Sequence, residues 1–253
     1  MRHPWIALAS IAATMLLWTC ATLFGWVDEL FLPSPALLWS AATELLTDGY
    51  KSRPLWEHLL YSAERVLAGF LLGAACGTLL GLAMGASRRT EAVAAPFIEF
   101  LRPLPQLAYL VLLIVWFGIG ETPKIALLFL TALPVAAVAA RDGVRGVPRS
   151  RIQAAEVLGA TPAQIFWHVV LPSALPEIFT GARLSIGIVY ATLIAAEIIA
   201  GHDGIGWMIL DAGRFLRSDY VFVGILIIGI AGIGLDLSLR GLQRRLVHWS
   251  GKP

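Results

Sequence analysis

The sequence predicts an all-α polytopic membrane protein with six transmembrane helices, on its composition and on the spacing of its charges. Of the 253 residues, 58% are hydrophobic and only 14% are charged, which lies well outside the usage of soluble domains. Charge-free runs long enough to cross a bilayer, alone or with their flanks, cover 4–27, 66–87, 103–120, 125–140 and 220–235. A sixth run, 184–201, is interrupted only by Glu197. Backbone groups in lipid have no water to bond, so each span is expected to be helical.

The placement of Lys and Arg predicts the orientation of these helices, because cytoplasmic loops carry most of the positive charge. With the N-terminus inside, the inner segments hold Arg2, Arg88, Arg89, Arg102, Arg141, Arg145, Arg149, Arg151, Arg183, Arg240, Arg244, Arg245 and Lys252. The outer segments hold the smaller set Lys51, Arg53, Lys124, Arg214 and Arg217. We therefore expect both termini and the loop 141–183 in the cytoplasm.

The outer segment 28–57 and the second membrane helix have recognisable local patterns. In the outer segment 28–57, Pro33 and Pro35 end any helix that continues from the membrane. Residues 36–46 then place apolar side chains on one face, which predicts a short interfacial helix. The second membrane helix carries a glycine every fourth residue, a pattern that lets a neighbouring helix approach closely. Tight packing inside one subunit and a sliding surface both fit this pattern, which comprises Gly69, Gly73, Gly77, Gly81 and Gly85.

The loop 141–183 predicts a helix, a bend and a second helix. The first helix is expected over 149–158, with Gly159 at a position where glycine commonly ends helices. Thr161 and Gln164 have the spacing of a capping box, and Pro162 suits the first position of the second helix. We expect Leu171-Pro172 to end that helix.

The same loop resembles the cytoplasmic EAA loop of binding-protein-dependent ABC importer permeases. That pattern reads Glu-Ala-Ala, three residues, Gly, nine residues, then Ile-x-Leu-Pro. Its alanine pair, glycine and Leu-Pro fall in register at Ala154, Ala155, Gly159 and Leu171-Pro172. Two positions depart from it, with Gln153 in place of the Glu and Val169 in place of the Ile. The segments 31–35, 102–105, 116–121 and 171–176 are similar to those of nitrate, sulfonate and taurine permeases, above all the taurine permeases.

The resemblance implies a type I importer with the MetI-like permease fold. Two copies of the chain would form the pathway, two ABC ATPase subunits would use ATP and Mg²⁺ beneath them, and an extracytoplasmic binding protein would deliver the solute. That solute would be taurine or an aliphatic sulfonate, with nitrate as another anion, crossing a bacterial inner membrane. The residues implied in coupling to the ATPase are Gln153, Ala154, Ala155, Glu156, Leu158, Gly159, Thr161, Leu171 and Pro172. The domain division expected is 1–58 for the first helix and outer loop, 59–245 for the transporter domain, and 246–253 for a cytoplasmic tail.

Other classes of protein find little support. The chain has no Gly-x-x-x-x-Gly-Lys-Ser/Thr loop, no Gly-x-Ser-x-Gly elbow and no His-Glu-x-x-His. We therefore expect a non-catalytic subunit without a cofactor or metal of its own. The net charge of +2 gives no reason to propose nucleic acid. The lipid bilayer is the expected surrounding, and the loop 141–183 lying on lipid headgroups is the alternative to docking on an ATPase.

A secondary transporter driven by an ion gradient is the alternative function, because such proteins use charges inside the membrane. Glu197 is the main candidate for such a charge. We expect it in the outer third of its helix, where it either faces the pathway or an extracytoplasmic gate, or pairs with a neighbouring helix in a structural role.

Overall fold

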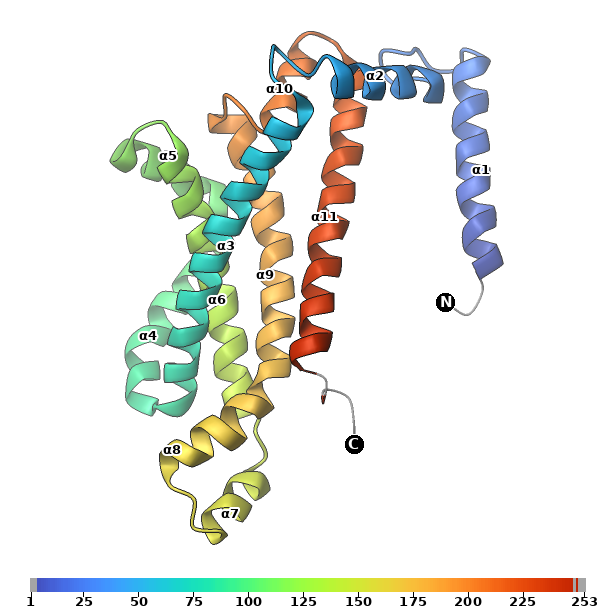
Figure 1. The fold of residues 1–253 in the computed structure, drawn as a ribbon. Coiled ribbons are helices and arrows are strands. Elements are labelled where there is room, and N and C mark those ends of the chain that lie inside the picture. Colours follow the sequence, from blue (N-terminus) through green and yellow to red (C-terminus); the bar gives the residue numbers. More distant parts are fainter. Residues whose placement is uncertain (1–3, 248, 250–253) are drawn as a thin grey trace. The chain divides into compact units, whose positions relative to one another are not determined.

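The computed structural model describes residues 4–247 and residue 249, and helices make up most of them (Figure 1). The helices are α1 Pro4–Leu23, α2 Pro35–Thr47, α3 Leu55–Ala86, α4 Arg88–Leu101, α5 Gln106–Phe117, α6 Glu121–Arg145, α7 Arg149–Val157, α8 Pro162–Ile165, the π-helical η1 Phe166–Val170, α9 Leu171–Ala200, α10 Ile205–Arg214 and α11 Ser218–Leu246. The expected tail 246–253 lies largely outside the described residues.

The residues fall into two units. Unit 1 comprises 1–61 and 201–230, and unit 2 comprises 62–200 and 231–253. The boundaries therefore lie inside α3, between α9 and α10, and inside α11. The expected domain division into 1–58, 59–245 and 246–253 stays a prediction.

In unit 1, the predicted interfacial helix is present as α2. Ser34 caps it, since its hydroxyl accepts a hydrogen bond from the Leu37 amide, and Pro35 occupies the first turn. The buried face of α2 packs against α10, a helix that the sequence analysis did not predict. The buried residues of this cluster are Leu38, Ala41, Leu45, Tyr50, Leu55, Ile205, Met208, Ala212, Tyr220 and Val223.

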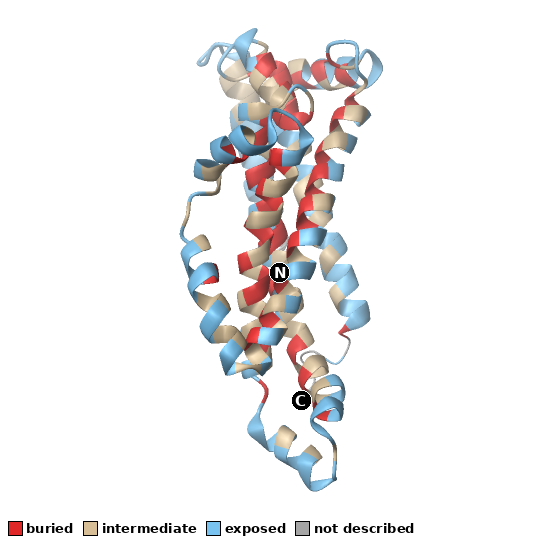
Figure 2. Ribbon diagram, turned by 90° about the vertical axis from the view of Figure 1, so that its left-hand side faces the viewer, coloured by how far each residue is buried: buried red, intermediate tan, exposed pale blue. Residues whose placement is uncertain are grey.

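In unit 2, α6 and α9 form the centre of the bundle, and most of the α6 span is buried. Figure 2 shows buried residues running along these helices while the connection at α7 is exposed. Since α6 ends at Arg145 and α9 begins at Leu171, the segment between them lies at one end of the bundle. Glu121 and Glu197 belong to the opposite end (Figure 1).

The glycine repeat of α3 packs against α6. A β-carbon added to Gly73 would overlap the carbonyl oxygen of Phe129, and one added to Gly81 would overlap that of Ala137. Side chains at these positions would force the two helices apart, so the repeat serves close packing inside one subunit. A sliding role for this surface stays a prediction.

Among the described residues, four helices are long and apolar enough to span a membrane: α3, α6, the continuous run Pro162–Ala200, and α11. The expected span 103–120 is instead the twelve-residue α5, which forms a pair with α4 bent by 100°. Leu104 and Pro105 interrupt the pair because proline disfavours helical backbone at the residue before it. The apolar part of α1, Leu8–Leu23, is shorter than the four spans. Six spans with cytoplasmic termini therefore stay a prediction.

Candidate functional site

The bend predicted at Gly159 is present at the end of α7. Gly159 has φ +79°, a backbone region that residues with a side chain rarely adopt. Its amide donates to the Glu156 carbonyl at 2.9 Å, and the Ala160 amide donates to the Ala155 carbonyl at 3.0 Å. This pair of bonds is a Schellman motif, which satisfies the last carbonyls of the helix and turns the chain sharply.

The tip of this bend is apolar and exposed. Val157 is 87% exposed and Leu158 is 86% exposed, and no residue of α7 is buried. Gln153, Ala154 and Glu156 belong to the same helix. A hollow of about 410 Å³ beside the tip is lined by Leu158, Gly159, Ala160, Gln164, His168 and Val169. Adjacent apolar side chains held in solvent by an ordered turn are typical of a binding surface.

The capping box of the second helix is also present. The Thr161 hydroxyl accepts a hydrogen bond from the Gln164 amide, and the Gln164 side chain accepts one from the Thr161 amide at 2.8 Å. Together with the Schellman motif, it fixes the chain on both sides of the bend. Local bonds therefore set the backbone on both sides of the bend, and Ala155 and Ala160 also pack against the cluster of Val147, Ile165 and Val170.

The expectation that Leu171-Pro172 ends the second helix is wrong. The helical path continues from Pro162 to Ala200, and Leu171 is the first residue of α9. The π-helical segment η1 makes this continuation feasible: the Leu171 amide bonds to the Phe166 carbonyl, five residues back. A proline in an α-helix clashes with the carbonyl four residues earlier, and the wider π turn directly before Pro172 relieves that crowding. The segment 162–170 is thus continuous with the membrane helix α9.

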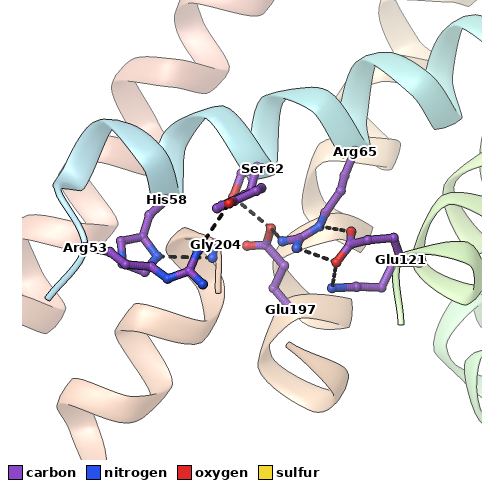
Figure 3. A network of polar contacts seen from close by, with 9 residues as sticks. Arg53, His58, Ser62, Arg65, Glu121, Glu197 and Gly204 are labelled. Atoms are coloured by element: carbon purple, nitrogen blue, oxygen red, sulfur yellow. Dashed lines mark hydrogen bonds and ion pairs between the residues drawn. The ribbon is translucent and has the colours of Figure 1, made fainter. Parts of the chain in front are cut away.

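At the opposite end of unit 2, Glu197 is fully buried and belongs to a network of charges (Figure 3). Its Oε1 accepts hydrogen bonds from Ser62 Oγ at 2.8 Å and from Arg65 Nη1 at 2.7 Å. Arg65 also donates to Glu121, which in turn pairs with Lys124 at 2.7 Å. Two carboxylates and two cations balance in this network, which links α3, α6 and α9.

The exposure of these side chains bears on whether Glu197 faces a gate or serves to join helices. The side chains of Arg65 and Lys124 are 3% exposed, whereas that of Glu121 is 53% exposed. The network therefore reaches solvent or lipid through Glu121 and not through Glu197. An interhelical role for Glu197 accounts for every one of these contacts, and its role in a gate stays a prediction.

The sequence analysis did not identify Arg65, Glu121 or Lys124 as partners of Glu197, and it did not include Val157 in the coupling surface. Arg65 lies 132 residues from Glu197 along the chain, so no local spacing signals their contact. Val157 was detectable, because it directly precedes Leu158 and Gly159 at the predicted end of a helix.

Unit 1 has a polar cluster of its own around α10. Asp211 accepts a hydrogen bond from the Tyr50 hydroxyl at 2.7 Å and pairs with Lys51 at 2.6 Å. Burial raises the pKa of the Asp211 carboxyl, but the bonds from Lys51 and Tyr50 outweigh burial and hold this pKa below its usual value. His58 stacks on Trp207 with ring centroids 5.9 Å apart. These contacts fix the connection between α2 and α3 on α10.

No site for a metal ion emerges in the part of the chain that the structure describes. Within 4–247 and 249, no three His, Cys, Asp or Glu side chains form a group that could hold one. Cys20 and Cys76 are both free thiols.

Comparison with known proteins identifies the family. Residues 73–248 match the family described as binding-protein-dependent transport system inner membrane component. The taurine transport system permease protein TauC of Escherichia coli K12 is 41% identical over 255 residues, which cover 99% of this chain and 92% of TauC. The putative aliphatic sulfonates transport permease protein SsuC of Bacillus subtilis 168 is 36% identical, covering 98% of this chain and 89% of SsuC.

A solved structure supports the same assignment. The inward-facing MetNI methionine ABC transporter contains a chain with 25% identity and a TM-score of 0.53, covering 81% of this chain and 99% of that one. The predicted family and the helical MetI-like fold are confirmed. The chain belongs to the binding-protein-dependent permease family of ABC transporters.

Proposed function

We propose that this chain is the membrane-spanning, non-catalytic subunit of an importer for taurine or an aliphatic sulfonate, and that α7 and the bend at Gly159 dock on a separate ABC ATPase. Two copies of the chain form the pathway, and an extracytoplasmic binding protein delivers the solute. The chain resides in a bacterial inner membrane. Its relatives named for taurine and aliphatic sulfonates support this substrate class.

The exposed tip at Val157 and Leu158 is the observation that carries the docking proposal. Burying both side chains in a groove of a partner contributes roughly 1.5–3 kcal/mol each. Left in water at the end of an ordered helix, they contribute nothing to the stability of this chain. A short helix whose apolar residues enter a hydrophobic groove is a recurring mode of recognition.

The continuity of η1 with α9 explains how docking drives transport. Displacement of the bend by a closing ATPase pair acts on α9 through Ala160 and Thr161, because the helical path runs unbroken from Pro162 to Ala200. The ATPase shifts the permease between states only if its contact with the loop differs in strength between them. The network of Arg65, Glu121 and Glu197 then holds α3, α6 and α9 together while they move.

Co-purification with the candidate ATPase tests this proposal. The double variant Val157→Asp/Leu158→Asp places two charges on the tip and disturbs no buried contact, so the folded permease should lose the ATPase. Ala163→Asp is the control for added charge, since it places one of the two negative charges at an exposed position of the same loop. Retention of the ATPase by the double variant would refute docking through this tip.

The alternative function, secondary transport driven by an ion gradient, has a weaker basis. Its main support was a charge inside the membrane at Glu197, and that carboxylate already bonds Arg65 and Ser62. Uptake of the solute by the purified permease alone, without an ATPase, would nevertheless establish it.

A further inference from the structure

Unit 2 holds a cavity between α9 and α11 that neither the coupling loop nor the buried charge network uses. Its volume is about 300 Å³, at the lower end of the range of small-molecule sites. The lining residues are Arg183, Ile186, Gly187, Tyr190, Gly232, Leu235 and Asp236.

Groups of both charges meet in the wall of this cavity. Arg183 approaches the Oδ1 of Asp236 with Nε at 3.2 Å and Nη2 at 3.1 Å. The other carboxylate oxygen of Asp236 pairs with Arg240 at 2.7 Å. A guanidinium and a carboxylate therefore lie side by side, with the ring of Tyr190 in the same wall.

Two glycines keep the cavity open. A β-carbon at Gly187 would meet no atom within 4 Å, so that position borders empty space. A β-carbon at Gly232 would lie 3.1 Å from the ring of Tyr190, so the absence of a side chain at Gly232 leaves room for this ring. Glycine inside a helix costs about 1 kcal/mol relative to alanine. Stability of the helices alone does not account for glycine at Gly187.

The Arg183–Asp236 pair is more exposed than the buried Arg65–Glu197 pair. Arg183 is 29% exposed and Asp236 is 38% exposed, and an ion pair of this kind contributes about 0–1 kcal/mol. Arg65 and Glu197 are 3% and 0% exposed, so separating them costs far more, because water cannot replace the lost contact at either buried charge. A ligand carrying both charges can therefore replace the Arg183–Asp236 contact at low cost.

We propose that this cavity is a binding site for a small zwitterion of the aminosulfonate class on its way through the permease. The sulfonate binds the guanidinium of Arg183, whose planar set of donors suits an oxyanion. The ammonium binds the carboxylate of Asp236, and Ile186 and Leu235 contact the carbon chain. This inference rests on the proposed function, and it places part of the substrate selection inside the membrane subunit.

Comparing the uptake of two solutes tests whether Asp236 binds the ammonium of the ligand. The complete complex of permease, ATPase and binding protein is reconstituted in liposomes and offered taurine or ethanesulfonate, which has the sulfonate but no ammonium. A hydrogen bond to a charged group contributes about 1.5–3 kcal/mol, so Asp236→Asn should lower taurine uptake roughly tenfold to a hundredfold. Ethanesulfonate uptake should change much less than taurine uptake, because this solute has no ammonium for Asp236 to bind and the ion pairs of Asp236 with Arg183 and Arg240 are partly exposed. An equal effect on both solutes would overturn the inference.

Filling the cavity gives a second test that leaves the charges intact. Gly187→Leu projects into the empty space, so the protein should fold normally and lose uptake of taurine. Gly234→Leu is the matched control, because Gly234 also faces open space in a helix but does not line the cavity. Normal taurine uptake in Gly187→Leu, or equal loss in both variants, would overturn the inference.

These outcomes are separable from a failure of the proposed function. If the wild-type complex does not assemble, or its ATP hydrolysis does not respond to the loaded binding protein, the importer proposal itself fails. If assembly and stimulated hydrolysis are intact while the variants keep the selectivity and uptake of the wild type, the cavity inference alone is wrong.

Discussion

The Nη1 of Arg65 lies 2.7 Å from the Oε1 of Glu197, and the two side chains are almost completely enclosed inside one helical bundle. Removing one member of such a pair costs about 3–5 kcal/mol, because the charge left behind has no compensation. Arg65→Met removes the guanidinium that faces Glu197 and leaves the hydrogen bond from Ser62 in place. We predict a large loss of thermal stability in detergent.

Lys124→Met is the matched variant in the same network. It leaves Glu121 paired with Arg65, and the Glu121 side chain is 53% exposed, so the carboxylate keeps a second source of compensation. The expected loss is about 1 kcal/mol. Equal losses in Arg65→Met and Lys124→Met would contradict the different roles assigned to the two cations.

The double variant Arg65→Met/Glu197→Leu separates stability from transport. Replacing a buried pair by apolar residues is often neutral, so the double variant should recover most of the stability lost in Arg65→Met. If Glu197 takes part in a gate, the recovered protein should still fail to transport. Full transport in a stable double variant would confine Glu197 to its structural role.

Local sequence patterns predicted the bend and the capping box of the loop 141–183. The bend at Gly159 and the capping box at Thr161 depend on residues within six positions of each other, and the structure contains both. The glycine repeat of α3 likewise follows one helix face. Each of these features is specified by residues that are close together in the sequence, so the local pattern is enough to predict it.

The features that were missed depend on partners far away or on competing local rules. Arg65 was not identified as a partner of Glu197, because its partners Glu121 and Glu197 lie on other helices. Pro172 looked like a helix end, because the π turn that accommodates it leaves no recognisable signal in the sequence. The helix α4 was missed because its arginines and glutamates resembled a loop, although they form one face of an amphipathic helix.

The packing of α3 on α6 predicts opposite effects for two glycine-to-alanine changes. Gly81→Ala would push a methyl group into the backbone of Ala137, and such overpacking costs about 1–3 kcal/mol. Gly234→Ala meets no atom within 4 Å, so the better helix propensity of alanine should stabilise the protein by about 0.5–1 kcal/mol. Thermal unfolding of the two variants checks the signs. A stabilising Gly81→Ala would show that the two helices are not in close contact.

The Asp211 cluster predicts a dependence of stability on pH. The pKa of the Asp211 carboxyl is held below its usual value in the folded protein. The stabilisation by Lys51 and Tyr50 is therefore complete above the unfolded pKa of about 3.9. It is lost as the pH falls through the lower folded pKa. Wild type and Asp211→Asn should therefore differ by a constant amount in unfolding temperature between about pH 5 and 8, and converge below about pH 4. A difference that persists undiminished into acid would show that the charge of Asp211 is not responsible.

The backbone at Gly159 predicts a graded series of ATPase affinities. Left-handed backbone costs a residue with a β-carbon about 1–2 kcal/mol, and asparagine tolerates it better than alanine. No atom lies within 4 Å of a β-carbon at this position, so the series reports on backbone conformation and not on crowding. If docking requires the bend, Gly159→Ala should weaken ATPase binding about fivefold to thirtyfold, and Gly159→Asn should weaken it less. The dissociation constants can be measured by titrating purified ATPase onto the permease in nanodiscs. Wild-type affinity in Gly159→Ala would mean that the ATPase does not require the loop in the bent form, and docking would then depend on the apolar tip alone.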